Sequence, residues 1–110
     1  MTTRGANEAQ RADFQAALVE YDKAIKLDKK NYKAYLNRAG VFRDLGDTER
    51  ALADYNQAII VNPRLPYALF GRGTLLWALG RRDEANRDFD ACLSVDPTFA
   101  TDINRFKTSN

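Results

Sequence analysis

Residues 51–63 read ALADYNQAIIVNP, and this stretch decides the fold. The same pattern occurs before it as ALVEYDKAIKLDK at 17–29 and after it as ANRDFDACLSVDP at 85–97, at a constant spacing. Within each copy the small and apolar side chains fall at i, i+1, i+4, i+7 and i+8, which is one stripe on an α-helix. Only Asn86 breaks this stripe. A period of about 34 residues predicts an array of stacked helical units.

Glycine and proline divide each period into two helices. Gly46 and Gly80 fall between the halves, where a glycine can take the left-handed conformation that ends a helix. Pro63 and Pro97 stand where the second helix must stop, and Pro66 suits the first turn of the following helix. We therefore predict helices near 2–11, 14–27, 32–45, 48–61, 66–79, 82–95 and 99–107.

The length and composition are typical of one globular domain. Of 110 residues, 45% are hydrophobic and 29% are charged. The 17 basic and 15 acidic residues are interspersed and leave a net charge of +2, without a basic block for phosphates, so we expect no nucleic-acid partner. No apolar run approaches the ~20 residues of a membrane span, and residues 1–5 lack the apolar core of a signal peptide. We expect no membrane partner and a cytoplasmic location.

Side chains for catalysis or metal binding are scarce. The chain has no histidine, and its single cysteine, Cys92, cannot form an internal disulfide or a thiolate cluster. Cys92 occupies the repeat position of Ala24 and Ala58, which predicts a buried small side chain rather than a nucleophile. The glycine–arginine–glycine run at 71–73 lies inside a predicted helix, not in a phosphate-binding loop. We predict no enzyme activity, no metal and no cofactor.

The repeats resemble the tetratricopeptide repeat family, whose 34-residue pattern is W-x2-L-G-x2-Y, then A-x3-F, then P. The matching residues of the second unit are Tyr35, Arg38, Ala39, Phe42, Ala51, Tyr55 and Pro63. Those of the third unit are Leu69, Arg72, Gly73, Leu76, Ala85, Phe89 and Pro97. The first unit keeps Gly5, Ala17 and Tyr21, but Glu8 stands at the aromatic site and Lys29 replaces the proline.

This resemblance implies an all-α fold, a right-handed superhelical stack of antiparallel helix pairs. We expect a single domain over 1–110, with units at about 1–29, 32–63 and 66–97 and a C-terminal capping helix at about 99–107. Residues 1–11 offer few large apolar side chains. Either the native chain continues upstream, or a second copy covers this end of the stack.

Arginines on the core-facing arcs of helices need partners, because an unpaired buried charge is costly. Three arginines are each followed by a carboxylate at the same sequence separation: Arg4 by Glu20, Arg38 by Asp54, and Arg72 by Asp88. We predict an arginine–carboxylate clasp between the two helices of each unit. The alternative is that the arginine side chains extend to water.

The resemblance also implies that the first helices of successive units line a concave peptide-binding groove. Independently, the helix predicted at 66–79 contains one charge and is apolar on two opposite faces, which predicts a partner surface on one of them. The predicted binding residues are Tyr67, Phe70 and Trp77 as anchors, Leu36 as an extension, and Asn37, Lys33, Arg43 and Arg105 as polar groups at the rim. The alternative is that the capping helix folds over this aromatic stripe and makes it ordinary core.

Two functions follow from these features. The first is binding of a peptide or partner protein in the groove. The alternative is a structural self-association module that forms homodimers or higher oligomers through an uncovered end or the aromatic stripe. Members of the family that grip chaperone C-termini share a clamp of lysine, asparagine and arginine. Asn37 matches its asparagine, but uncharged residues stand at the other clamp sites, namely Thr2, Ala6, Tyr67 and Gly71.

Overall fold

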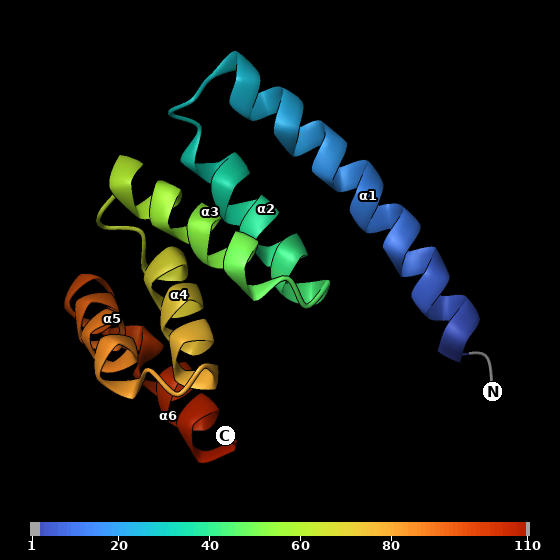
Figure 1. Cartoon of the computed structure of the whole chain (residues 1–110). Coiled ribbons are helices and arrows are strands. Elements are labelled where there is room, and N and C mark those ends of the chain that lie inside the picture. The colour runs from blue at the N-terminus through green and yellow to red at the C-terminus, as the bar shows by residue number, and fades with distance from the viewer. Residues whose placement is uncertain (1–2, 110) are drawn as a thin grey trace.

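A computed structural model describes residues 3–109, and side chains from residue 10 onward. These residues form only helices: α1 (Thr3–Leu27), α2 (Tyr32–Asp44), α3 (Thr48–Val61), α4 (Pro66–Ala78), α5 (Arg82–Val95), the short 3-10 turn η1 (Pro97–Phe99) and α6 (Ala100–Ser109). Helices α2 and α3 form one antiparallel pair and α4 and α5 a second, stacked on the first (Figure 1). The predicted all-α stack of helix pairs is confirmed.

Local sequence explains where the four paired helices begin and end. Gly46 and Gly80 both have φ 82°, the left-handed conformation that a side chain disfavours, and each ends a first helix. The side chains of Asn31 and Asp47 accept hydrogen bonds from backbone N–H groups in the first turns of α2 and α3. The bounds agree to about a residue with the helices predicted at 32–45, 48–61, 66–79 and 82–95.

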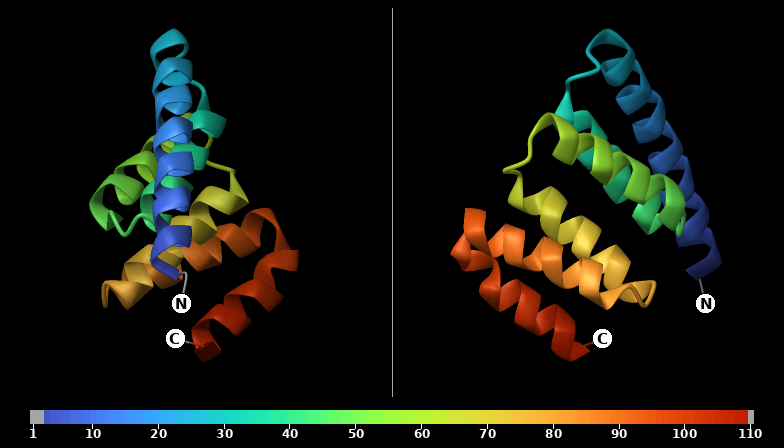
Figure 2. Two further views of the ribbon diagram at one scale, coloured as in Figure 1. Left: turned by 90° about the vertical axis from the view of Figure 1, so that its right-hand side faces the viewer. Right: turned by 60° about the vertical axis from the view of Figure 1, so that its left-hand side comes forward.

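The N-terminal region differs from the prediction of two helices near 2–11 and 14–27. A single continuous helix, α1, runs from Thr3 to Leu27, while residue 2 lies outside the described part. The repeat position that holds Gly46 and Gly80 in the later units holds Ala12 in the first unit. Alanine is about 1 kcal/mol better than glycine inside a helix and is poorly suited to the left-handed turn. The helix therefore continues, and α1 follows the edge of the stack as a straight rod (Figure 2).

Small side chains occupy the places where helices cross. The exposed fraction is 0% for Ala39, Ala51, Ala85 and Cys92, so helices approach closely there while larger side chains fill the space beside them. Gly73 faces the ring of Phe89: a Cβ at this position would lie 2.6 Å from a ring carbon. Cys92 is a packing residue, as predicted from the repeat position that it shares.

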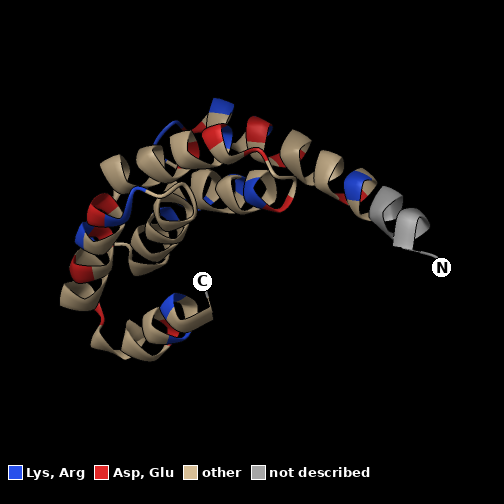
Figure 3. Cartoon of the chain, turned by 60° about the horizontal axis from the view of Figure 1, so that its bottom comes forward, with Lys and Arg blue, Asp and Glu red and all other residues tan. Residues whose placement is uncertain are grey.

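The last helix covers the C-terminal end of the stack. Phe99 and Ile103 are buried against the second helix pair, and the Phe106 ring lies 6.1 Å from that of Phe89. Figure 3 shows the helices following an arch, with α6 turned toward its inner side. The capping helix predicted near 99–107 is thus present as η1 and α6.

The arginine clasp is confirmed in both complete pairs. Nε and Nη2 of Arg38 donate to the Asp54 carboxylate at 2.7 and 2.8 Å, and the same atoms of Arg72 donate to Asp88 at 2.8 and 2.7 Å. Both aspartates are buried. Hydrogen bonds to the carboxylates raise the pKa of both guanidinium groups further above their usual range. The arginine of each clasp therefore keeps its positive charge at any pH that the fold tolerates.

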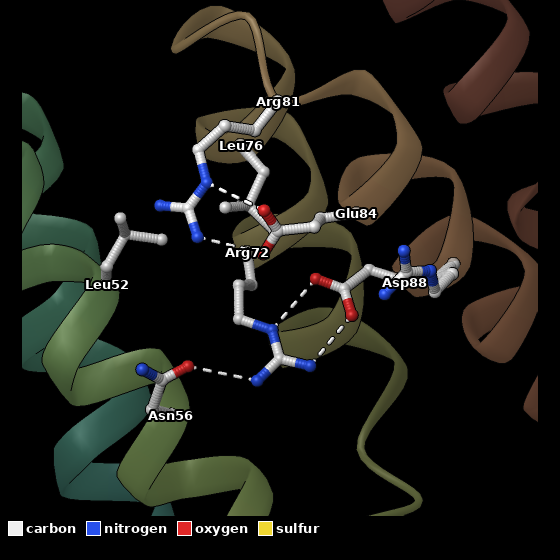
Figure 4. A pocket seen from close by; sticks show the side chains of 8 residues that line it. Leu52, Asn56, Arg72, Leu76, Arg81, Glu84 and Asp88 are labelled. Atoms are coloured by element: carbon white, nitrogen blue, oxygen red, sulfur yellow. Dashed lines mark hydrogen bonds and ion pairs between the residues drawn. The ribbon is translucent and has the colours of Figure 1, made fainter.

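Each clasp also reaches a third helix, a contact that the repeat pattern does not predict. The remaining nitrogen, Nη1, donates to Asp22 of α1 at 2.8 Å from Arg38, and to Asn56 of α3 at 2.9 Å from Arg72 (Figure 4). Both acceptors precede their arginine by 16 residues. One arginine thus ties together its own pair and the preceding second helix. The third predicted pair, Arg4 with Glu20, lies outside the described side chains.

Removal of one clasp charge tests this arrangement. Asp88→Asn should lower the free energy of unfolding by about 3 kcal/mol, because Arg72 is left partly buried without its counter-charge. Urea unfolding followed by circular dichroism measures the change. Asp90→Asn, an exposed change on the same helix, is the control and should cost less than about 0.5 kcal/mol. Equal stability of Asp88→Asn and the unaltered protein would show that the clasp contributes nothing.

The buried thiol gives a second test of the packing. Burial raises the pKa of Cys92 from 9.0 to about 11, so the folded protein disfavours the thiolate. The stability that this neutral thiol contributes is complete below pH 9 and is lost as the pH rises toward 11. We expect Ellman's reagent at pH 8 to react much more slowly with native protein than with urea-unfolded protein. Rapid reaction under native conditions would contradict the burial.

Candidate functional site

A pocket of about 400 Å³ opens where α2 and α4 lie side by side. Residues from α1 to α4 line it: Tyr21, Leu36, Asn37, Gly40, Arg43, Asp44, Tyr55, Tyr67, Phe70 and Gly71. Five of the eight predicted binding residues are brought together there, namely Leu36, Asn37, Arg43, Tyr67 and Phe70. The structure therefore places most of the predicted groove residues around one hollow.

Tyr55 supplies a polar group at this pocket. Its ring is 3% exposed, and Arg43 Nη1 donates a hydrogen bond of 3.1 Å to its hydroxyl oxygen. Burial raises the pKa of Tyr55, so the phenol stays neutral at physiological pH and its O–H remains a donor. Arg43, with 46% of its side chain exposed, adds a positive charge beside it, and its Nε lies 3.8 Å from the exposed Asp44 carboxylate. The pair can therefore donate hydrogen bonds to a carboxylate or carbonyl oxygen.

Gly71 makes room for this tyrosine. A Cβ at Gly71 would lie 2.5 Å from Cζ and 2.8 Å from the hydroxyl oxygen of Tyr55, so only glycine lets the ring lie beneath α4. Gly40, by contrast, has nothing within 4 Å of a built Cβ. Sequence reasoning missed Tyr55 and Gly71, because Tyr55 belongs to the repeat's apolar stripe and was expected to be core alone.

Tyr67 and Phe70 form the apolar wall of the pocket. Tyr67 is 65% exposed, and its ring meets the edge of Phe99 at a centroid distance of 5.2 Å. Phe70 is half-buried, with Phe99 at 5.7 Å and Phe106 at 6.5 Å behind it. The capping segment therefore supports these rings from one side and leaves Tyr67 open on the other.

Three predicted binding residues lie outside the pocket. Trp77 is half-buried, with its ring 6.3 Å from Phe89 and 6.5 Å from Phe106. The capping helix thus covers this part of the aromatic stripe, as the alternative interpretation proposed. Lys33 and Arg105 are exposed and do not contribute to the lining.

A second pocket, of about 330 Å³, surrounds the clasp of the second pair. Its polar side chains satisfy one another: Arg72 binds Asp88, and Arg81 binds Glu84 at 2.8 Å (Figure 4). We assign this pocket a structural role, because four of its five charged side chains are paired with one another; the fifth is Arg87. Among residues 3–109 there is no group of three or more His, Cys, Asp or Glu arranged to hold a metal ion. No helix in that range combines the length and apolar character of a membrane span.

Family models of tetratricopeptide repeats match three overlapping segments, at 20–53, 39–80 and 66–99. The chain belongs to the tetratricopeptide repeat family. The matches cover both complete helix pairs and residues 20–27 of α1, so the tetratricopeptide assignment rests on the same residues that build the clasps and the pocket. Comparison with curated protein sequences gives no match.

Solved tetratricopeptide structures share this fold. A tetratricopeptide repeat protein from Parabacteroides merdae is 38% identical over 87% of this chain, with a TM-score of 0.74. MamA is 26% identical over 88% of the chain, with a TM-score of 0.75. The chain spans 38% of the former protein and 57% of the latter.

Two of the similar structures contain a bound peptide. The second tetratricopeptide domain of Spaghetti (RPAP3), bound to the HSP90 peptide SRMEEVD, is 28% identical over 86% of this chain and 88% of its own, with a TM-score of 0.73. Tetratricopeptide domains of this size and fold thus include peptide-binding modules. The chain is accordingly a protein-interaction module at the level of its family.

The two glycines of the pocket make a matched pair for mutation. Gly71→Ala should lower the free energy of unfolding by about 2 kcal/mol, because the new Cβ must displace the buried Tyr55 ring. Gly40→Ala should raise it by about 0.5–1 kcal/mol, because open space surrounds the position and alanine favours the helix. Urea unfolding measures both changes. Shifts of the same sign would contradict the described position of the Tyr55 ring.

Proposed function

We propose that this tetratricopeptide domain binds a peptide segment of a partner protein in the pocket between α2 and α4. The supporting observation is that the exposed ring of Tyr67 and the half-buried ring of Phe70 face the same hollow as Asn37 and Arg43. Surface aromatic side chains beside polar donors in a concavity are typical of binding sites. The proposed role requires no catalysis.

The two walls suit different parts of a peptide. Tyr67 and Phe70 offer apolar area with few rotatable bonds, which suits an apolar side chain of the ligand. The Asn37 amide can both donate to and accept from a peptide backbone. Arg43 and the Tyr55 hydroxyl suit an acidic side chain or a C-terminal carboxylate. We therefore propose a ligand segment with an apolar side chain close to a carboxylate.

Residues outside the pocket receive secondary roles in this proposal. The cationic side chains of Lys33 and Arg105 are exposed and would act through longer-range attraction to an acidic ligand. Trp77 supports the site indirectly by packing against Phe106 of the capping helix, which lies behind Phe70.

The chaperone-tail mode is not the one proposed. A domain of RPAP3 binds the peptide SRMEEVD, and such domains resemble one another in a clamp of several cationic side chains. In this chain Tyr67 and Gly71 stand at two of those clamp positions, so Arg43 is the principal cation of the pocket. One arginine and an asparagine cannot reproduce several charged donors.

Selection from a phage-displayed random peptide library, with the domain as bait, supplies a probe. Fluorescence anisotropy of the selected, labelled peptide then measures Kd for each variant. Tyr67→Ala and Arg43→Ala should each raise Kd by about tenfold or more, because each removes a proposed anchor. Ile60→Ala is the control, since Ile60 is 70% exposed on α3 and does not line the pocket.

The outcomes separate the proposal from its rivals. Equal Kd values for Tyr67→Ala, Ile60→Ala and the unaltered domain would place the peptide elsewhere and refute the pocket. The peptide SRMEEVD serves as a second probe and should bind at least about tenfold more weakly than the selected peptide. Tighter binding of SRMEEVD would refute the argument from the missing clamp charges.

A further inference from the structure

Helix α6 does not pack on the second pair as a first helix packs on the pair before it. In α4, Ala68 is buried against the first pair. The residue at the same repeat position of α6, Asp102, is exposed. Ile103 is buried instead, although its repeat equivalent Leu69 packs against the second helix of its own pair. Helix α6 is thus rolled relative to a stacked first helix, and it lies toward the inner side of the arch (Figure 3).

The surface that α6 covers is aromatic. We call the rings of Phe70, Trp77 and Phe89 the inner aromatic surface. Phe106 of α6 contacts all three rings, at centroid distances of 6.5, 6.5 and 6.1 Å. Phe99, just before α6, lies 5.7 Å from Phe70. The inner aromatic surface is therefore shielded from water by side chains of the capping segment.

Four residues of the capping segment make this contact in a helical pattern. Phe99, Ile103 and Phe106 follow one another at i, i+4 and i+7, which places them on one helical face. The next residue, Lys107, holds its ammonium group 5.3 Å from the centre of the Trp77 ring, within the range of a cation–π interaction. This pattern describes a helix that fits the inner aromatic surface.

The capping helix lacks the ionic anchor of the other first helices. Phe106 stands at the repeat position of the clasp arginines, Arg38 and Arg72. A phenyl ring cannot donate the hydrogen bonds by which these arginines bind two neighbouring helices. Asp90 of α5, at the repeat position of the two Nη1 acceptors, is exposed. Helix α6 is therefore held mainly through its apolar side chains.

A buried oxygen on α5 adds a cost to the covered state. Oδ1 of Asn86 is buried and, within the described part of the chain, accepts no hydrogen bond. Asn86 occupies the repeat position of Leu52, which packs against the core clusters of both pairs, between α3 and α4. Asn86 thus belongs to the face of α5 that meets the capping segment. An unsatisfied buried acceptor destabilises the packing around it, and opening of α6 would return this oxygen to water.

We propose that α6 is a displaceable cover, and that a partner protein binds the inner aromatic surface through an amphipathic helix in its place. The partner's helix carries large apolar side chains at i, i+4 and i+7 and a basic residue at i+8, as the capping segment does. Local opening occurs most readily at elements with few stabilising contacts, and a partner needs only to bind the open state. The proposal does not rest on peptide binding in the pocket between α2 and α4, which α6 does not line.

The single tryptophan, Trp77, reports on the cover in solution. Ile103→Asp places a charge where the side chain is 3% exposed, so it should release α6 and shift the emission of Trp77 to longer wavelength. Asn104→Asp adds the same charge at an exposed position of α6 and is the matched control, with unchanged emission. A synthetic peptide with the sequence of residues 97–109, which contains no tryptophan, should bind the Ile103→Asp protein at least about tenfold more tightly than the control protein. Its binding should also reverse the emission shift.

Hydrogen exchange of the unaltered protein gives an independent readout. The backbone amides of α6 should exchange at least about tenfold faster than those of α5. Equally slow exchange, or a folded Ile103→Asp protein whose Trp77 emission is unchanged or that does not bind the peptide, would overturn the proposal. Phe106→Ala takes the place of Ile103→Asp if circular dichroism shows that the latter is unfolded. A dimer in sedimentation equilibrium that Ile103→Asp abolishes would show that α6 of a second copy is the occupant, and would overturn the assignment to a partner protein.

Discussion

The fold depends on one arginine in each of the two complete helix pairs, which binds on both sides of its helix. A guanidinium group has five N–H donors in one plane, so Nε and Nη2 can bind one carboxylate while Nη1 reaches a different acceptor. Arg38 and Arg72 use this geometry to join three successive helices. Lysine, with a single ammonium group, could not hold two partners in such fixed directions. The same side chain therefore sets the angle within a pair and the stacking between pairs.

The pocket is a consequence of that stacking. Because each clasp anchors a first helix to the second helices before and after it, α2 and α4 are held beside each other on the inner side of the arch. Their outward residues can then vary without affecting the core, which explains why α2 presents Asn37 and Arg43 while α4 presents Tyr67 and Phe70. The fold and the chemistry of the surface are encoded at different positions of the same helices.

Most of the fold could be predicted from the sequence because its signals are local and repeated. Gly46 and Gly80 end helices by their own conformation, and the shared separation of arginine and aspartate predicted both clasps. The error at α1 came from carrying the two-helix pattern of the unit to a segment where Ala12 provides no turn. The binding residues were harder to predict. Phe106 covers Trp77 because of the path that the chain takes after Pro97. The position of Trp77 around its helix does not predict that path. The contribution of Tyr55 depends on the missing side chain of Gly71, which lies on another helix.

Tyr21 belongs both to the half-buried stripe that it forms with Ala17 and Ala24 on α1 and to the lining of the pocket. Anything that packs on the stripe therefore changes the surroundings of one pocket wall, and a ligand in the pocket changes the surroundings of the stripe. A partner on this stripe and a peptide in the pocket would contact the same residue, and any coupling between the two would have the same free energy in both directions.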